Sequence, residues 1–285
     1  MKLFVHFFDG MRHLLSWICG FSWLRNLIPM QMKKLVRRLR IYVWRRGAYQ
    51  ELLRDQGRQG RRVLHFLHIS KTGGTAIKSS LAGRFNTDRY HVLVTPHPFR
   101  LRDVPIGEAF AFILRDPIRR FVSAFNHRLA EGRPAYCDPW TAAERKAFTA
   151  FPDANSLGRA LASSDRKVYR QAVWAMRHIA LLDTPYTFWL GSLSYLQSRD
   201  SDLCFIGFQE SLTEDFERFQ TIAGYPEVVC LPTDAGKANR TGSSSTKLDP
   251  EAERALRVWY AEDYALHEYC KSLSGKSSPE KPDVE

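Results

Sequence analysis

The sequence lacks an apolar run long enough to cross a membrane as a helix. In its apolar N-terminal segment the longest stretch without Lys, Arg, Asp or Glu covers residues 13–24, whereas a membrane-spanning helix needs about 20 apolar residues. A cleaved signal peptide also fits poorly, because Asp9 interrupts the apolar region and no A-x-A site follows. We therefore expect neither a spanning anchor nor a cleaved leader in this segment.

Cysteine is scarce and its pattern is irregular. The five cysteines are an odd number, widely scattered, and none forms a CxxC pair. This excludes a disulfide framework and a zinc site, and favours a reducing compartment. No His/Cys/Asp cluster has the spacing of metal ligands, so no metal is expected. A hydrophobic content of 44% over 285 residues can fill a real core, which excludes a disordered chain.

Acidic residues are scarce in only one part of the chain. Residues 1–62 hold 14 Lys/Arg against 3 Asp/Glu, and the remainder holds 28 against 27. No known nucleic-acid-binding module accompanies this charge, so nucleic acid is not expected as a partner. Residues 1–60 interleave cations with Phe, Trp and Leu, which is typical of an amphipathic helix on an anionic membrane. Helices packed on the domain with a solvated basic face fit equally well, and both interpretations stay open.

From residue 61 onward, short apolar runs alternate with amphipathic segments. Strands are predicted at residues 63–69, 91–94, 109–114 and 203–208. Helices are predicted over 75–85, from Pro117, over 139–182 with breaks near Pro152 and Asp165, from a capping box at 211–214, and from Pro250 to about Cys270. This alternation predicts an α/β domain over 61–272 with a P-loop-like parallel sheet flanked by helices. A basic amphipathic helical extension, residues 1–60, would precede it, and a flexible tail, 273–285, would follow.

The first predicted strand runs directly into the segment SKTGGTA, residues 70–76. Glycines after a parallel strand let backbone N–H groups turn toward an anion, and the following helix adds positive potential. Lys71 adds a full charge at the mouth of this loop. The loop differs from the Walker A pattern, GxxxxGK[ST], because the lysine precedes the glycines. Taken alone, the segment fits an anion-binding loop and an ordinary strand-to-helix turn equally well.

A second motif, RDPIRRFVSAF at residues 115–125, follows the predicted strand at 109–114. Arg115 lies at the carboxyl end of that strand, where open α/β sheets bind ligands. Ser123 lies two turns into the next helix and can reach back toward the same place. A guanidinium group and a hydroxyl together make a good phosphate clamp. The alternative is a surface ion pair between Arg115 and Asp116, with Ser123 at a helix packing contact.

The two motifs in this order resemble those of sulfotransferases that use 3′-phosphoadenosine 5′-phosphosulfate, and within them the carbohydrate branch that includes the heparan sulfate 2-O-sulfotransferases. The resemblance runs from about His65 to Cys270 and includes FIGFQE at 205–210 and NRT at 239–241. It implies sulfuryl transfer to a hydroxyl of a glycan or glycolipid. Related animal enzymes use a spanning anchor that this N-terminus does not provide. We therefore expect a bacterial-type, cytoplasmic enzyme, with peripheral contact at the inner face of an anionic membrane.

The resemblance also implies which residues hold the donor nucleotide. The 5′-phosphosulfate would be held by Lys71, Thr72, Gly73, Gly74, Thr75 and Ala76, the 3′-phosphate by Arg115 and Ser123, and Arg240 would close over the nucleotide. The sequence departs from the family pattern at two of these loop positions. Ser70 stands where proline is usual, and Ala76 stands where Ser or Thr is frequent, so one hydroxyl contact would be missing.

Sulfuryl transfer also needs a base for the acceptor hydroxyl, and His and Glu are the usual choices. Residues 90–99 offer His91 and His97. His97 follows the carboxyl end of the second strand between two prolines that stiffen its loop, and in related sulfotransferases a histidine after this strand resembles the base. We predict His97 as the base. His65 and His68 are expected to be structural, and Glu210 to be a helix-cap partner.

Other functions remain open at this stage. Lys71 would stabilise the leaving group in a sulfotransferase, but a non-catalytic nucleotide-binding protein on the same fold, or a sulfotransferase for a non-carbohydrate acceptor, has the same motifs. A nucleotide kinase would need a GK[ST] loop and a magnesium-binding carboxylate, and neither is evident. The aromatic residues that either stack on a sugar or fill the core are Tyr136, Trp140, Tyr169, Trp174, Tyr186 and Trp189.

Overall fold

The computed structural model describes residues 61–133, 137–233 and 247–274. The predicted extension over residues 1–60, the tail from residue 275 and the two residues Tyr136 and Arg240 lie outside these ranges. Within them, no helix is both long and apolar enough to span a bilayer. The same ranges contain no group of three or more His, Cys, Asp or Glu side chains that could hold a metal ion.

Four parallel strands form the central sheet, as the sequence predicts. They are β1 (Arg62–Leu67), β2 (Tyr90–Val94), β3 (Ala109–Leu114) and β4 (Leu203–Phe208). Their spatial order is β2-β1-β3-β4. The chain passes from β1 to β2 on one side and then to β3 on the other side of β1. In open α/β sheets, ligands bind at the carboxyl ends of the strands where the order reverses in this way.

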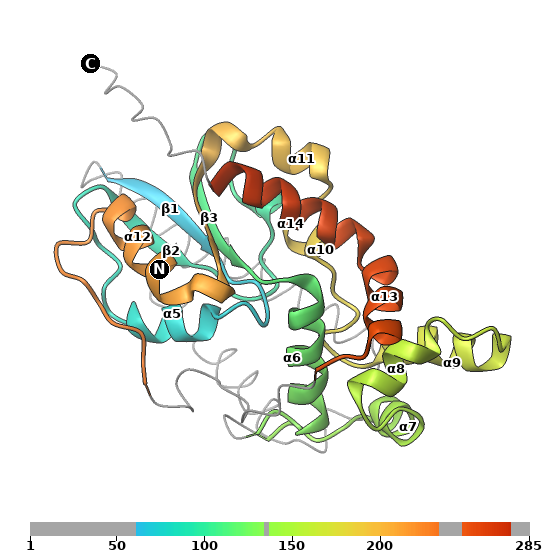
Figure 1. Ribbon diagram of the computed structural model, residues 1–285. Coiled ribbons are helices and arrows are strands. Elements are labelled where there is room, and N and C mark those ends of the chain that lie inside the picture. Colours follow the sequence, from blue (N-terminus) through green and yellow to red (C-terminus); the bar gives the residue numbers. More distant parts are fainter. Residues whose placement is uncertain (1–60, 134–136, 234–246, 275–285) are drawn as a thin grey trace, which may run out of the picture.

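Helices cover both faces of the sheet (Figure 1). One face carries α5 (Gly74–Ser80) and α12 (Leu212–Ala223), and the other carries α10 (Tyr186–Leu190), α11 (Leu193–Gln197) and α14 (Ala261–Ser274). Strand β3 explains this arrangement, because it is apolar throughout. Its residues alternate between two separate buried clusters, one beneath each layer of helices. A strand buried on both faces is typical of a parallel sheet.

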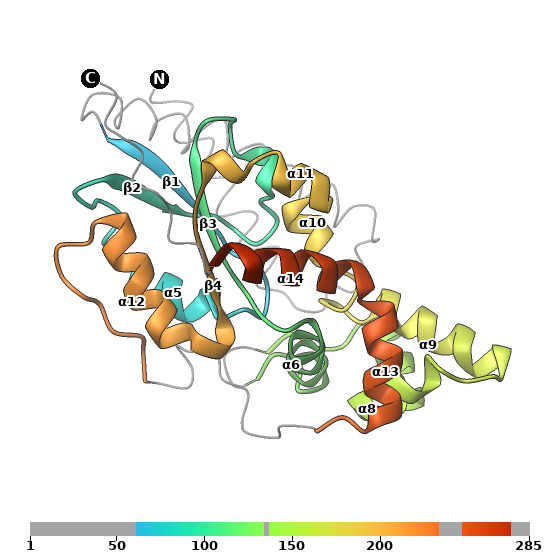
Figure 2. The ribbon, with the colours of Figure 1, turned by 45° about the horizontal axis from the view of Figure 1, so that its top comes forward.

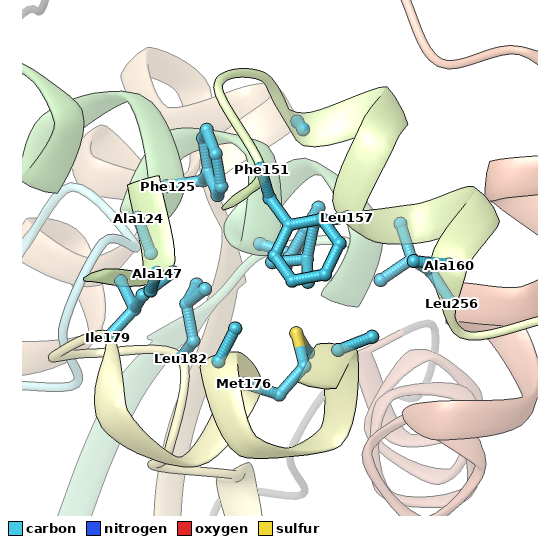
Figure 3. Close-up of a cluster of buried hydrophobic side chains, with 14 of the residues drawn as sticks. Ala124, Phe125, Ala147, Phe151, Leu157, Ala160, Met176, Ile179, Leu182 and Leu256 are labelled. Atoms are coloured by element: carbon cyan, nitrogen blue, oxygen red, sulfur yellow. The ribbon is translucent and has the colours of Figure 1, made fainter. Parts of the chain in front are cut away.

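A third core lies beside the sheet, among helices only (Figure 2). Its helices are α6 (Pro117–Leu129), α7 (Ala142–Ala150), α8 (Ala154–Ala160), α9 (Arg166–His178) and α13 (Pro250–Trp259). Figure 3 shows Phe125, Leu157, Met176 and Leu256 converging from four of these helices. The predicted breaks near Pro152 and Asp165 are confirmed, because Asp153 caps α8 and Asp165 caps α9.

Three local predictions are wrong in detail. The helix predicted to run to residue 85 ends at Ser80, before a turn in which Gly83 has a φ of 77°. The final helix is two helices, α13 and α14, because Tyr260 leaves helical geometry between them (φ −100°, ψ 26°). The second of these helices continues to Ser274, past the predicted helix end at about Cys270.

The predicted capping box at residues 211–214 does not form. The Ser211 side chain accepts no hydrogen bond from the first turn of α12. Its hydroxyl donates instead to Asp215 Oδ2 at 2.8 Å, and the same oxygen accepts the Phe208 N–H at 2.6 Å. Asp215 therefore joins the end of β4 to the start of α12, through the short 3₁₀ turn Gln209–Ser211. Two further 3₁₀ turns, Leu101–Asp103 and Asp200–Asp202, precede β3 and β4.

Candidate active site at the carboxyl ends of the strands

The loop between β1 and α5 has the backbone shape of an anion-binding loop. Lys71 and Gly73 both adopt left-handed conformations, with φ values of 69° and 93°. Such residues among right-handed ones turn successive N–H groups toward one concave side. Among the described residues, no backbone carbonyl accepts a hydrogen bond of normal geometry from the N–H groups of residues 71–75. Consecutive donors that lack a well-formed backbone partner are available to a bound anion.

Close packing inside the loop explains its glycines. A Cβ atom on Gly74 would lie 2.2 Å from Cδ2 of His68, so this position tolerates no side chain while the His68 ring stays in place. The Thr72 side chain is buried, and its hydroxyl donates to the Ile69 carbonyl at 3.0 Å. Thr72 therefore tightens the loop with its side chain and has its backbone N–H left for a ligand.

Lys71 lies close to charged or titratable groups at the end of β3 and on α6. Burial, followed by the nearby Arg115 charge, lowers the pKa of Lys71 to about 8. Burial and the Lys71 charge likewise lower the pKa of His127, on α6, to about 4. The Arg115 Nη1 group also donates to the Lys71 carbonyl at 3.5 Å. The two motifs, far apart in sequence, thus place their cations together, and His127 is a neighbour that sequence analysis missed.

Arg115 carries an unused donor at the end of β3. Its Nε atom is buried and has no hydrogen-bond partner in the described part of the chain. Burial lowers the pKa of Arg115. The alternative surface pair with Asp116 does not form, because Asp116 caps α6 at the Arg119 N–H (2.9 Å) and accepts the Tyr264 hydroxyl (3.0 Å). An orphaned guanidinium N–H beside the loop donors fits a phosphorylated, anionic co-substrate.

Ser123 lies on α6 and is half-buried. It precedes His127 by four residues, and residues at this spacing share one side of a helix. Because the Lys71 charge acts on His127, this spacing is consistent with Ser123 on the side of α6 nearer the loop. This spacing was the signal by which sequence reasoning could have found His127. Arg240, the third residue implied to hold the nucleotide, lies outside the described residues.

The structure brings His97, and not His91, to the loop. The Nδ1 atom of His97 lies 3.1 Å from the His68 carbonyl and 3.2 Å from Ser70 Oγ. Because a carbonyl can only accept, Nδ1 carries a proton and the neutral ring has its lone pair on Nε2. His91 lies near the opposite end of β2, where its Nδ1 atom is 2.6 Å from Asn86 Oδ1.

The other candidate side chains have structural contacts. The His68 ring lies 3.8 Å, between centroids, from the ring of His97. Burial, followed by the His97 and Lys78 charges, lowers the pKa of His68 to about 2, so this ring is neutral. His65 is buried and contacts Glu108. Glu210 accepts the Asp116 N–H at 3.0 Å, which joins β4 to the start of α6.

The structure also sorts the aromatic residues considered for sugar stacking. Tyr186 and Trp189 are core residues, with 0% and 1% of their surface exposed, so the stacking alternative is wrong for both. Trp140 and Trp174 are half-buried, and Tyr169 is 44% exposed on α9. A pocket of about 270 Å³ lies elsewhere, between α12 and the segment 229–233.

The fold and the site define an α/β protein with an anion-binding loop and two convergent cations at the carboxyl ends of its strands. The family model of the Sulfotransferase family matches residues 58–270, which span both motifs and all four strands, and the chain belongs to this family. No curated protein and no solved structure matches the chain. The predicted sulfotransferase superfamily is therefore confirmed.

Proposed function

We propose that the protein transfers a sulfuryl group from 3′-phosphoadenosine 5′-phosphosulfate to a hydroxyl of a carbohydrate, in a glycan or glycolipid acceptor. One observation carries this proposal. The loop N–H groups of residues 71–75, which make no backbone hydrogen bond of normal geometry, lie with the Lys71 charge and the orphaned Arg115 Nε, and His97 lies on the adjoining loop. Membership in the Sulfotransferase family supports sulfuryl transfer.

The donor would be held through both of its phosphates. The loop N–H groups and Lys71 would hold the 5′-phosphosulfate, which needs many donors for its oxygens. Arg115 and Ser123 would hold the 3′-phosphate, because a guanidinium group recognises phosphate through charge-assisted hydrogen bonds. Arg240 is proposed to close over the same nucleotide. These cations neutralise the donor without a metal ion.

In the proposed reaction, an acceptor oxygen attacks sulfur as the bond between sulfur and the bridging phosphate oxygen breaks. The Nε2 lone pair of His97 takes the acceptor proton, because the Nδ1 proton of this ring is engaged with the His68 carbonyl. Lys71 stabilises the negative charge that develops on the bridging oxygen of the leaving adenosine 3′,5′-bisphosphate. The products are the sulfated acceptor, the bisphosphate and protonated His97, which returns its proton to solvent.

Turnover of labelled donor with glycan, glycolipid, phenol and tyrosyl-peptide acceptors tests this function. We expect His97→Ala to lower turnover roughly 10²–10⁴-fold while affinity for the bisphosphate stays unchanged. His178→Ala is the matched control, because the Nδ1 atom of His178 also lies within hydrogen-bonding distance (2.7 Å) of a backbone carbonyl, that of Trp174, on α9. Bisphosphate binding without turnover on any acceptor would favour the non-catalytic alternative. Transfer to phenols alone would reject the carbohydrate acceptor.

The site of action is proposed from residues 1–60, which lie outside the described part of the chain. Their excess of cations would hold the enzyme at the inner face of an anionic membrane, near a lipid-linked acceptor. Each basic residue at the surface contributes about 1 kcal/mol to such binding. Sedimentation with phosphatidylserine vesicles at low salt should therefore pellet the full chain, and a variant with Arg37, Arg38 and Arg40 changed to Glu should pellet less. Equal pelleting of the two proteins would reject the membrane contact.

A further inference from the structure

The short helix α10 contacts both the donor side and the acceptor side of the proposed active site. The Tyr186 hydroxyl donates to the Arg115 carbonyl at 2.5 Å and accepts the Arg115 N–H at 3.1 Å. Three residues later in the same helix, Trp189 Nε1 donates to the His97 carbonyl at 2.6 Å. One turn of helix thus holds the backbone of the proposed phosphate-binding residue and that of the proposed base.

The sheet itself does not join these two residues directly. His97 follows β2 and Arg115 follows β3, and β1 lies between those strands. Moreover, His97 and Arg115 both lie beyond the last paired residues of their strands. The hydrogen bonds from α10 therefore supply a link at this end of the sheet that the strand ladder lacks.

Helix α10 is itself firmly held. The rings of Tyr186 and Trp189 are buried, and the Arg120 guanidinium of α6 lies over both, at 4.7 Å and 5.4 Å from their centroids. The Tyr186 N–H donates to Asp263 Oδ1, on α14, at 2.8 Å. Arg120 also donates to the Thr184 carbonyl, just before α10. A fully buried polar network of this kind is rigid, because each group has few alternative partners.

We propose that Tyr186 and Trp189 are positioning residues that fix the spacing between Arg115, where the donor binds, and His97, where the acceptor loses its proton. The proposal rests on the function proposed above. Its physical basis is that a transfer reaction needs donor and acceptor held within a narrow range of distances, so a small displacement of one side lowers the rate strongly. Neither side chain needs to touch a substrate to have this effect.

The two residues should have separable effects, because each contacts one side only. Tyr186→Phe removes the hydroxyl that holds Arg115 and keeps the ring beneath Arg120. It should weaken binding of adenosine 3′,5′-bisphosphate by roughly tenfold, because both hydrogen bonds that hold the Arg115 backbone are lost. Trp189→Phe removes the indole N–H that holds His97. It should lower kcat at saturating donor by roughly tenfold and leave the bisphosphate affinity unchanged.

The experiment compares the full-length wild-type protein with Tyr186→Phe, Trp189→Phe and a control, Tyr225→Phe. The Tyr225 hydroxyl donates to a backbone carbonyl as well, that of Arg84 at 3.1 Å, but away from the site. Calorimetry gives the bisphosphate affinity, labelled donor gives kcat, and thermal unfolding gives the stability of each variant. Trp189→Phe is also combined with His97→Ala, and we expect no further loss of kcat in that background, since Trp189 acts through His97.

A merely structural role predicts a different result. If both variants resemble Tyr225→Phe in affinity and kcat, whatever their thermal stability, the positioning role is overturned. An equal further loss from Trp189→Phe in the His97→Ala background also overturns it. If Trp189→Phe does not fold, the bisphosphate affinity of Tyr186→Phe tests the proposal by itself. An affinity equal to that of the wild-type protein then rejects it. Failure of the wild-type protein to bind the bisphosphate would instead reject the proposed function.

Discussion

Two arginines, Arg128 in the helical layer and Arg115 at the strand ends, differ in their ion-pair partners. Arg128 donates from Nε and Nη2 to the two carboxylate oxygens of Glu144 (2.7 Å and 3.0 Å) and from Nη1 to Asp138 Oδ2 (3.1 Å). Arg115 has no ion pair with any residue that the structure describes, and its buried Nε has no acceptor there. The helical layer uses its buried charge for its own structure, whereas the described part of the strand ends leaves Arg115 without an ion-pair partner, as the proposed anion site requires.

The presence or absence of ion-pair partners changes the energetic cost of burying these charges. A buried charge is tolerated when its partners replace the lost hydration. At Glu144, burial acts to raise the pKa, but hydrogen bonds from Arg128 and Thr141 outweigh it and lower the pKa. Around Lys71 and Arg115, burial lowers both pKa values, and the Glu210 charge offsets this only in part at Arg115. Neither cation forms an ion pair with a carboxylate in the described ranges. The strand ends therefore hold buried cations without the compensation that Arg128 has, which is the arrangement that the proposed anion site needs.

The largest expected effect is on the stability of the helical layer. Arg128→Met should lower the free energy of unfolding by about 3–5 kcal/mol, because it leaves Glu144 as a buried charge without its partner. Arg115→Met should change it by less than about 1 kcal/mol, since no ion pair is lost. Urea unfolding of both variants measures the two effects. Adding Glu144→Gln to Arg128→Met should recover part of the loss, and a strongly destabilised Arg115→Met would contradict the comparison.

The next effect is on nucleotide binding. Here the substitution of Arg115, and not that of Arg128, should have the larger effect. Arg115→Met should weaken binding of adenosine 3′,5′-bisphosphate by about 1.5–3 kcal/mol, because a charge-assisted contact to the 3′-phosphate is lost. Its effect on AMP, which has no 3′-phosphate, should be small. Titration calorimetry with both nucleotides checks this. An equal loss for AMP and the bisphosphate would show that Arg115 does not select the 3′-phosphate.

The smallest effect is a pH dependence that only the strand ends should show. The pKa of Lys71 is lowered from 10.5 to about 8 by burial and by Arg115, so in the free protein this ammonium loses its proton as the pH rises through 8. A bound anion favours the protonated form. Bisphosphate affinity should therefore be constant between about pH 7, above the phosphate pKa of about 6, and about pH 8, and should fall above pH 8 by up to about tenfold per pH unit. Lys71→Met should bind weakly with a flat profile, and a sloping profile in this variant would assign the titration to another group.

Local sequence patterns determined much of the fold. The four strands, the start of α6 at Pro117 and the breaks between α7, α8 and α9 lie close to their predicted positions. The reason is that apolar periodicity, N-terminal caps and proline act within a few residues. The placement of Lys71 and Arg115 at carboxyl ends of strands was predictable for the same reason, because a motif that follows a strand lies where the strand ends.

Only the tertiary structure decided how these parts meet. The sequence predicts that His97 follows the carboxyl end of β2, but only the register of β2 against β1 and the packing of the loop bring its Nδ1 atom to 3.2 Å from Ser70 Oγ. The roles of Tyr186 and of Trp189 in holding Arg115 and His97 were equally hidden, because their partners lie 71 and 92 positions away in the chain. Hydrogen bonds over such separations depend on how whole layers pack. The sequence by itself therefore determined which elements carry the site, and packing decided the distances within it.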